Sequence, residues 1–334
     1  MRKRLAVGVC VVTLSACGGR TQSDANTQVT SDDECSRPAG TVETIARAAF
    51  QPGPIATDST SVYWFEIRPM GLTAFAKNTR DVTELAPGHL GQAMMTDDQY
   101  VYWIEAFGKL LRAPKTGGTA QVLAAKAPSD AAQVWIQLTL DESFVYWVNE
   151  GPQGGKPKSI SDRSQVFRIA KSGGSIDVLA SGQQDVSDVA VNADYVYWIA
   201  RDGIWRWSNA AQTTERFLNV GIERPEVYGL ALDDSYVYWS DDHDVFRSST
   251  AHPNAERVLS EAAPVLAMFL NGSCLYAVAG DSLVRGAKSG GAPRVVADLR
   301  GNRPTFMTVD DSGVYWTVPP TSSSDPGRVM HVSP

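Results

Sequence analysis

A short aromatic motif recurs along this 334-residue chain. The tripeptide Val-Tyr-Trp occurs six times, and a degenerate Leu-Tyr-Ala copy fills the one wide gap between them. Successive copies are about 40 residues apart, and an Asp or Asn lies six positions before each tryptophan and before Ala277 of the degenerate copy. Seven copies in one phase indicate seven equivalent units. The copies begin at Val62, Val101, Val145, Val196, Val237, Leu275 and Val314, and the residues before them are Asp58, Asp97, Asp141, Asn192, Asp233, Asn271 and Asp310.

A repeat of about 40 residues with short apolar segments is typical of a β-propeller, in which each repeat forms one four-stranded sheet, or blade. In the fifth repeat the pattern predicts strands over 228–232, 236–240, 245–247 and 256–259, because aromatic and β-branched residues favour strands. Paired glycines at 117–118, 173–174 and 290–291 suit tight turns before the fourth strand. We therefore predict an all-β, seven-bladed β-propeller over residues 41–334, with four antiparallel strands per blade.

The seventh repeat contains only three strand segments, near 305–309, 314–318 and 328–332. Residues 42–46, at the other end of the repeat region, resemble the fourth-strand segments 121–124 and 177–180. Pairing of this N-terminal strand with the last blade would close the ring and remove an exposed strand edge. We predict that closure.

The repeated positions suggest how the blades pack. Side chains alternate along a strand, so Val and Trp of each tripeptide face one way and Tyr the other. Each Trp is then expected to fill the space between neighbouring blades, although an exposed carbohydrate-binding platform is an alternative. The third strands carry a recurrent cation, which predicts a structural ion pair or cation–π contact in each blade. Its positions are Arg112, Arg168, Arg206, Arg247 and Arg285, with His331 in the seventh repeat.

The repeats resemble those of the YWTD and related bacterial propeller families, which share WD40-like spacing. Tyr238-Trp239-Ser240-Asp241 comes closest to the YWTD motif, and the resemblance extends over nearly all of 41–334. It implies the propeller fold. True YWTD propellers have six blades, and most copies here lack the acidic fourth position. Epidermal-growth-factor-like flanking modules are missing too, so no receptor function is implied. Propellers include binding proteins, scaffolds and enzymes, so the resemblance says little about function.

The N-terminal end of the chain predicts export. Arg2, Lys3 and Arg4 precede the apolar stretch 5–13, which is too short to span a bilayer but has the proportions of a secretory signal. Leu14-Ser15-Ala16-Cys17 resembles a bacterial lipobox. The resemblance implies a signal peptide over 1–16, acylation of Cys17, for example with palmitate, and a cell-envelope location. Gly18 after the cysteine implies the outer membrane. An ordinary signal peptide with an incidental cysteine is the alternative.

Residues 17–40 are rich in Ser, Thr, Asp, Gln and Gly, and this composition predicts a flexible tether between the lipid and the propeller. Lipid on Cys17 would hold the protein at the membrane without a transmembrane helix. The whole chain has a formal charge of −7, and loss of three basic residues with the signal would make it −10. That charge argues against a nucleic-acid partner and permits a cationic one.

Loop lengths predict where a ligand binds. In an antiparallel blade the first-to-second and third-to-fourth connections share one face, and the other connections share the opposite face. Nearly all length variation falls on the opposite face, at 126–133, 149–165 and 319–327. Function is often carried by variable loops on a rigid scaffold. We therefore place the binding surface there, with candidate residues Glu66, Glu105, Asn149 and Asp241, two positions after their tripeptides, around the mouth of the central channel.

Asp241, Asp242, His243 and Asp244 form a compact acidic cluster on the same predicted face. Oxygen ligands of this kind suit a hard cation such as Ca²⁺, whereas Asp is also common in solvated turns. Both interpretations stay open. We expect no other metal or cofactor.

Motifs for common catalytic chemistry are absent from the sequence, including Gly-x-Ser-x-Gly, His-Glu-x-x-His and the phosphate-binding loop. The histidines at 89, 243, 252 and 331 show no paired spacing. The sequence therefore favours a monomeric, non-enzymatic envelope lipoprotein that binds a protein, peptide or glycan. A hydrolase or lyase with a composite site at the channel mouth, using Glu66, Glu105, Asp241 or His243, is the alternative, and a purely structural component is a third.

Four cysteines are present. Cys10 falls in the signal and Cys17 in the lipobox, which leaves Cys35 and Cys274. An exported protein can keep a disulfide, so these two residues are candidates for a bridge that ties the tether to the sixth blade.

Overall fold

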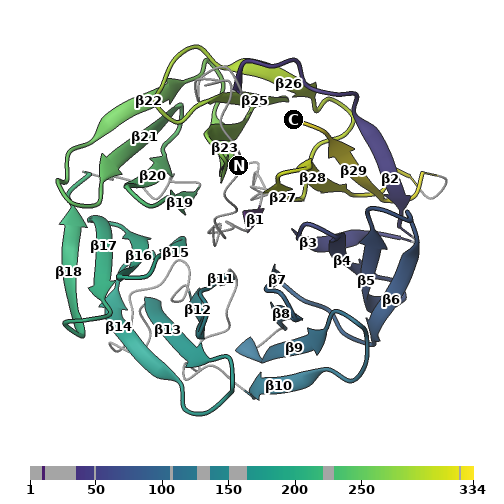
Figure 1. The fold of residues 1–334 in the computed structure, drawn as a ribbon, viewed down its shortest axis with the longest axis horizontal. Helices are drawn as coiled ribbons and strands as arrows, with labels where there is room; N and C mark the ends of the chain where they lie inside the picture. Colours follow the sequence, from purple (N-terminus) through teal and green to yellow (C-terminus); the bar gives the residue numbers. More distant parts are fainter. Residues whose placement is uncertain are drawn as a thin grey trace, which may run out of the picture.

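Seven sheets surround a central axis in the computed structural model (Figure 1). The structure describes residues 10–11, 35–48, 50–105, 108–125, 136–149, 164–220, 229–322 and 325–334. Each sheet contains four consecutive antiparallel strands except the last, which is completed from the N-terminal side. The predicted all-β, seven-bladed propeller is therefore confirmed.

Each of the first three blades is a simple four-stranded meander. Blade one consists of β3 (Pro52–Thr57), β4 (Ser61–Ile67), β5 (Met70–Ala76) and β6 (Val82–Pro87). Blade two consists of β7 (Ala93–Thr96), β8 (Tyr100–Ile104), β9 (Leu110–Pro114) and β10 (Gln121–Ala124). Blade three consists of β11 (Ile136–Leu140), β12 (Phe144–Asn149), β13 (Ser164–Ala170) and β14 (Asp177–Gln183).

Blades four to six repeat the pattern. Blade four consists of β15 (Val189–Val191), β16 (Tyr195–Ala200), β17 (Gly203–Ser208) and β18 (Thr213–Leu218). Blade five consists of β19 (Leu230–Leu232), β20 (Tyr236–Ser240), β21 (Asp244–Ser249) and β22 (Glu256–Ser260). Blade six consists of β23 (Val265–Asn271), β24 (Cys274–Ala279), β25 (Ser282–Ala287) and β26 (Arg294–Asp298).

Blade seven closes the ring as the sequence predicts. Its strands β27 (Phe306–Asp310), β28 (Gly313–Val318) and β29 (Arg328–Val332) are joined by β2 (Glu43–Arg47), which pairs antiparallel with β29. The short strand β1 (Cys10–Val11) pairs parallel with the inner edge of β27. The rest of the predicted signal peptide, Cys17 and the tether up to residue 34 lie outside the described residues.

The core consists of seven apolar clusters, one at each junction between blades. At the first junction Tyr63 of blade one packs with Val101 and Trp103 of blade two. The seventh junction places Tyr315 of blade seven with Val62 and Trp64 of blade one. The predicted alternation of the tripeptide is therefore correct. Its six tryptophans are at most 3% exposed, so they cannot form a carbohydrate-binding platform.

The recurrent third-strand cations make the predicted contacts. The Arg112 guanidinium lies 4.3 Å from the centre of the Tyr100 ring, and Arg206 lies 4.2 Å from that of Tyr195. Arg168, Arg247 and Arg285 lie over Phe144, Tyr236 and Tyr276. Ion pairs with the fourth strand accompany three of them, to Asp177, Glu215 and Glu256. In blade seven the His331 ring stacks on Tyr315 at 4.5 Å.

A disulfide joins Cys35 to Cys274 of blade six, across 239 residues of sequence. Residues 35–42, purple in Figure 1, run from blade six to β2 of blade seven. Within the described part of the chain there is no helix with the length and apolar composition needed to cross a bilayer.

Candidate functional site

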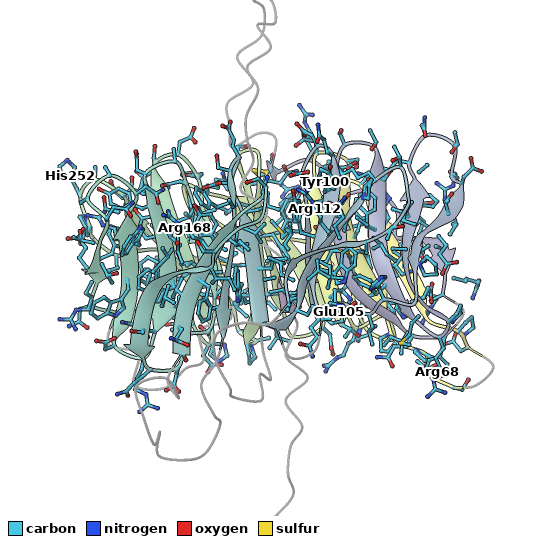
Figure 2. The ribbon with its side chains drawn as sticks, turned by 90° about the horizontal axis from the view of Figure 1, so that it is seen from below. Arg68, Tyr100, Glu105, Arg112, Arg168 and His252 are labelled. Carbon is cyan, nitrogen blue, oxygen red and sulfur yellow. A yellow bond between two sulfur atoms is a disulfide. The ribbon has the colours of Figure 1, made fainter. Side chains whose placement is uncertain are left out.

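The connections between strands divide into two classes on opposite faces. First-to-second connections contain two or three residues and third-to-fourth connections four to six, so we call this side the short-turn face. On the opposite side, the variable face, connections range from the dipeptide 68–69 after β4 to the long segment 150–163 after β12. Figure 2 shows His252, from a third-to-fourth turn, near one face and Arg68 and Glu105 near the other. The segments 106–107, 126–135, 150–163, 221–228 and 323–324 of the variable face lie outside the described residues.

Glu66 lies near the end of β4 on the flank of blade one. Its Oε1 accepts the indole N–H of Trp64 at 2.8 Å, because residues two apart on a strand face the same way. The side chain lines a groove of about 270 Å³ at the seam between blades seven and one. The sequence prediction placed Glu66 at the channel mouth, whereas strand-two side chains point toward the neighbouring blade. The groove residues are Arg47, Glu66, Pro69, Thr73, Val82 and Glu84.

Glu105 takes part in a small polar cluster on the variable face of blade two. The Nδ1 atom of His89 lies 2.7 Å from Glu105 Oε1, which also accepts the Trp103 indole N–H at 3.4 Å. Lys109 Nζ lies 3.6 Å from Oε2. The His89 and Glu105 side chains are 26% and 21% exposed. Because Nδ1 of His89 contacts Glu105, Nε2 is the ring nitrogen that could bond a ligand. The alternative is that the His89–Glu105 pair only supports Trp103.

Local packing holds the His89 connection in place. Its Gly91 lies against the Phe65 ring of blade one, where an added Cβ would be only 2.5 Å from the nearest ring carbon. Phe65 in turn contacts Trp103 edge-on at 5.6 Å between ring centres. Glycine at 91 therefore permits the close approach that brings His89 over Trp103, at 5.4 Å between rings.

The acidic cluster of blade five forms a turn. Asp241 Oδ1 accepts the backbone N–H of Asp244 at 3.1 Å, and His243 Nε2 lies 3.4 Å from Asp242 Oδ2 at the surface. Among the described residues, no three His, Cys, Asp or Glu side chains are grouped so that they could hold a metal ion. Asn149 ends β12, but its side chain lies outside the described residues. Glu66, Glu105 and Asp241 thus belong to blades one, two and five, and each is engaged locally.

Asp188 is a buried carboxylate that the sequence prediction missed. It is 4% exposed and precedes β15, the inner strand of blade four. Its Oδ1 accepts the N–H of Val189 and its Oδ2 that of Leu230 in blade five, both at 2.8 Å. Burial raises the pKa of Asp188 to about 7, although the two N–H donors act in the opposite direction. The residue therefore joins two inner strands and titrates near neutral pH.

The short-turn face carries a repeated polar network, which the sequence prediction also missed. In four repeats the Asp six positions before the motif Trp accepts the hydroxyl of the motif Tyr and backbone N–H groups of its own turn. Asp58, for example, accepts the Ser61 N–H and the Tyr63 hydroxyl, both at 2.9 Å. A lysine from the next blade then reaches the same carboxylate. The pairs are Lys115–Asp58, Lys171–Asp97, Lys288–Asp233 and Lys77–Asp310. The sequence contained a signal for these pairs, because in each repeat that supplies the lysine this residue directly follows the third strand, in phase with the Asp.

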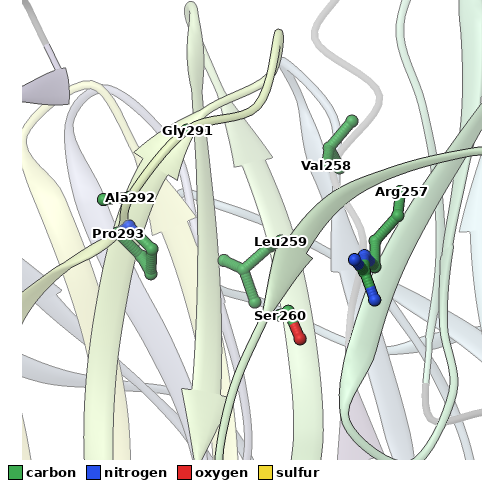
Figure 3. A pocket seen from close by; sticks show the side chains of 7 residues that line it. All are labelled: Arg257, Val258, Leu259, Ser260, Gly291, Ala292 and Pro293. Carbon is green, nitrogen blue, oxygen red and sulfur yellow. The ribbon is translucent and has the colours of Figure 1, made fainter.

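The second groove lies at the outer rim between blades five and six (Figure 3). It has a volume of about 390 Å³ and is lined by residues 257–260 of β22 and 291–293 of the blade-six turn. Arg257 is the charged residue of its lining, and its Nη1 lies 3.7 Å from Asp244. The groove is shallow and mostly apolar, and none of the candidate residues lines it.

Comparison with known proteins shows the fold. No protein-family model matches the chain, and no curated protein matches its sequence. An oligogalacturonate lyase in complex with manganese has a TM-score of 0.65 at 10% identity, over 88% of this chain and 93% of that chain. YCF48 bound to D1 peptide has a TM-score of 0.63 at 9% identity, over 89% and 97%. PorZ, a surface component of the type-IX secretion system of Porphyromonas gingivalis, has a TM-score of 0.59 at 14% identity, over 82% and 36%. At these identities the likeness shows the β-propeller fold alone.

Proposed function

We propose that this protein is a lipid-anchored component of the cell envelope that binds a protein or peptide through its variable face. The carrying observation is the contrast between the faces. Each of the two classes of turn on the short-turn face varies by at most two residues around the ring, whereas the opposite connections range from the dipeptide 68–69 to the long segment 150–163. A rigid scaffold that varies on one side only is typical of a recognition surface.

Two exposed apolar side chains favour a protein or peptide over a glycan. Phe50, in the connection from β2 to β3, is 42% exposed, and Met70, at the start of β5, is 50% exposed; both lie on the variable face. Arg68 lies 5.1 Å from the centre of the Phe50 ring. Aromatic residues, Met and Arg are enriched at protein interfaces, so this Phe50–Arg68–Met70 patch is the proposed contact.

The lipobox at Cys17 supports the membrane anchor, and the Cys35–Cys274 disulfide fits an oxidising compartment outside the cytoplasm. Cleavage before Cys17 would remove β1, so the inner edge of β27 would be left without that partner. Replacement Cys17→Ser should abolish incorporation of a labelled fatty acid and release the protein from sedimented envelopes. Unchanged fatty-acid incorporation would contradict the anchor.

The binding surface is tested by affinity capture from native envelopes after cross-linking. We expect the double variant Phe50→Ser, Met70→Ser to lose a partner that the unchanged protein recovers. The matched control is Val122→Ser, which replaces another apolar side chain of 50% exposure on the outer strand of blade two. Equal recovery by all three proteins would contradict the proposed patch.

A further inference from the structure

The segment that begins at Cys35 enters the ring from the short-turn face. Strand β2 begins at Glu43, which pairs with His331, and His331 Nε2 lies 3.0 Å from the carbonyl oxygen of Ser312 in a first-to-second turn. The strand ends at Arg47, opposite Arg328, next to a variable-face connection. Before β2, the Gly40 N–H donates to the Ser333 carbonyl at 3.2 Å. Residues 40–43 therefore contact the ring at its short-turn face.

Residues 35–37 accept the hydrogen bonds that, in other blades, a third-strand arginine donates to the third-to-fourth turn of the next blade. In other blades the third-strand arginine donates Nη1 to a carbonyl of the next blade's turn, as Arg112 does to Lys171 and Arg247 to Lys288, at 2.7 and 2.8 Å. Blade seven takes its fourth strand from the N-terminal side and has no such turn. Arg285, 1% exposed, instead donates Nε to the Cys35 carbonyl at 3.1 Å and Nη2 to that of Arg37.

The disulfide fixes the same segment. Cys274 is the first residue of β24, directly after the 272–273 turn of the short-turn face, and it holds Cys35 there. The attachment of the N-terminal segment is therefore covalent, hydrogen-bonded and confined to the short-turn side of blades six and seven.

We propose that the short-turn face is turned toward the anchoring membrane and the variable face away from it, toward a protein or peptide partner in the aqueous compartment. The inference rests on the proposed lipid at Cys17. Cys35 follows Cys17 by eighteen positions, a length that would reach roughly 60 Å if fully extended and about 23 Å if it followed random-coil statistics. Turning the variable face toward the lipid would require the segment to pass around the ring and stretch.

The charges on the short-turn face indicate that the face itself does not bind the membrane. The orientation of the protein is therefore set by the point at which its N-terminal segment is attached. Lysines of this face are paired with aspartates of the preceding blades. Exposed carboxylates remain, and anionic lipid headgroups repel them. They are Asp98, Glu142, Asp194, Asp234 and Asp311. The protein without its lipid is therefore expected to stay off anionic vesicles.

Two exposed alanines of blade five provide a matched pair of probe positions. Ala251 lies in the third-to-fourth turn before β22, on the short-turn face, and Ala262 lies in the connection after β22, on the variable face. The five residues of β22 separate the two positions by at least about 17 Å. Each would be changed to Cys in the full lipidated protein, labelled with a donor dye under non-reducing conditions and reconstituted into vesicles containing an acceptor-labelled lipid.

We expect at least twofold greater energy transfer from Ala251→Cys than from Ala262→Cys, and a smaller difference when the 17–34 segment is doubled in length. Equal transfer from both positions, or greater transfer from Ala262→Cys, would overturn the inference. If neither labelled protein floats with the vesicles while both melt like the unchanged protein, the lipid anchor itself fails, which is a separate outcome. The Cys17→Ser variant, which cannot carry the lipid, gives the background energy transfer. If that variant floated with the vesicles, the short-turn face itself would bind the membrane, and the inference that the lipidated segment orients the protein would be overturned.

Discussion

Lys115 of blade two reaches across the blade junction to the carboxylate of Asp58 in blade one, with Nζ 2.5 Å from Oδ2. Both side chains are less than one-fifth exposed. The same pair recurs at three other junctions and is missing where the partner residue changes: Thr250 occupies the lysine position opposite Asn192, and Asn209 occupies it opposite Asp141. The pair therefore joins adjacent blades wherever both residues are present.

Replacement Lys115→Met should lower the free energy of unfolding by about 1–3 kcal/mol, because it leaves the half-buried Asp58 carboxylate without its cation. Urea denaturation measures the change. The control is Lys109→Met: the Lys109 side chain is 38% exposed and its Nζ lies 3.6 Å from Glu105 Oε2, and exposed pairs contribute little. Equal losses for both variants would contradict a special role for the junction pair.

Acid should weaken the same junction. Burial acts to raise the pKa of Asp58, but hydrogen bonds from Lys115 and Thr60 outweigh it and lower the pKa to about 2. Between this value and the ordinary pKa near 4, the unfolded chain binds a proton that the folded protein does not, so this contribution is lost as pH falls from about 4 to about 2. Asp58→Asn should reduce the dependence of the melting temperature on pH over that range. An unchanged slope would count against the assignment.

The motif tryptophans should be the most sensitive core positions. Trp198, fully buried between blades three and four, should cost about 3–5 kcal/mol when changed to Ala, through lost apolar burial and the resulting cavity. The half-buried Trp205 in the same blade is the control, and its change to Ala should cost clearly less. Thermal unfolding compares them, and a wild-type midpoint for Trp198→Ala would refute the packing role.

Loss of the disulfide should loosen blade six. The double variant Cys35→Ser, Cys274→Ser should be less stable by about 2–5 kcal/mol, and the amides of residues 36–42 should exchange hydrogen faster. Reduction of the unchanged protein should reproduce both effects, which separates loss of the bond from effects of the serines. Identical melting of the oxidised and reduced protein would contradict the prediction.

Asp188 should make stability fall as pH rises toward neutrality. Its folded pKa of about 7 exceeds the ordinary value, so from about pH 4 to 7 the folded protein holds a proton that the unfolded chain has lost. Relative to Asp188→Asn, the unchanged protein should lose up to about 4 kcal/mol over this range. Denaturation at several pH values measures the difference, and parallel profiles would show that Asp188 does not titrate there.

Much of the fold can be predicted from the amino-acid sequence alone. The number of blades, the order of strands within a blade and the completion of blade seven by residues 42–46 follow from local patterns that repeat in phase, namely six Val-Tyr-Trp tripeptides and one degenerate copy. Successive side chains of a strand point in opposite directions, so the opposite facing of Tyr63 relative to Val62 and Trp64 could be predicted without knowing their neighbours, although all three side chains are buried.

The polar contacts were decided by tertiary structure. Lys115 and Asp58, or Asp188 and Leu230, belong to different repeats, and only the stacking angle between blades determines that they meet. The same geometry turns Glu66 toward the flank of blade one and brings His89 to Glu105. Periodicity therefore determined how many sheets form and which residues each one buries, whereas contacts between sheets depend on their placement in three dimensions, which no single repeat contains.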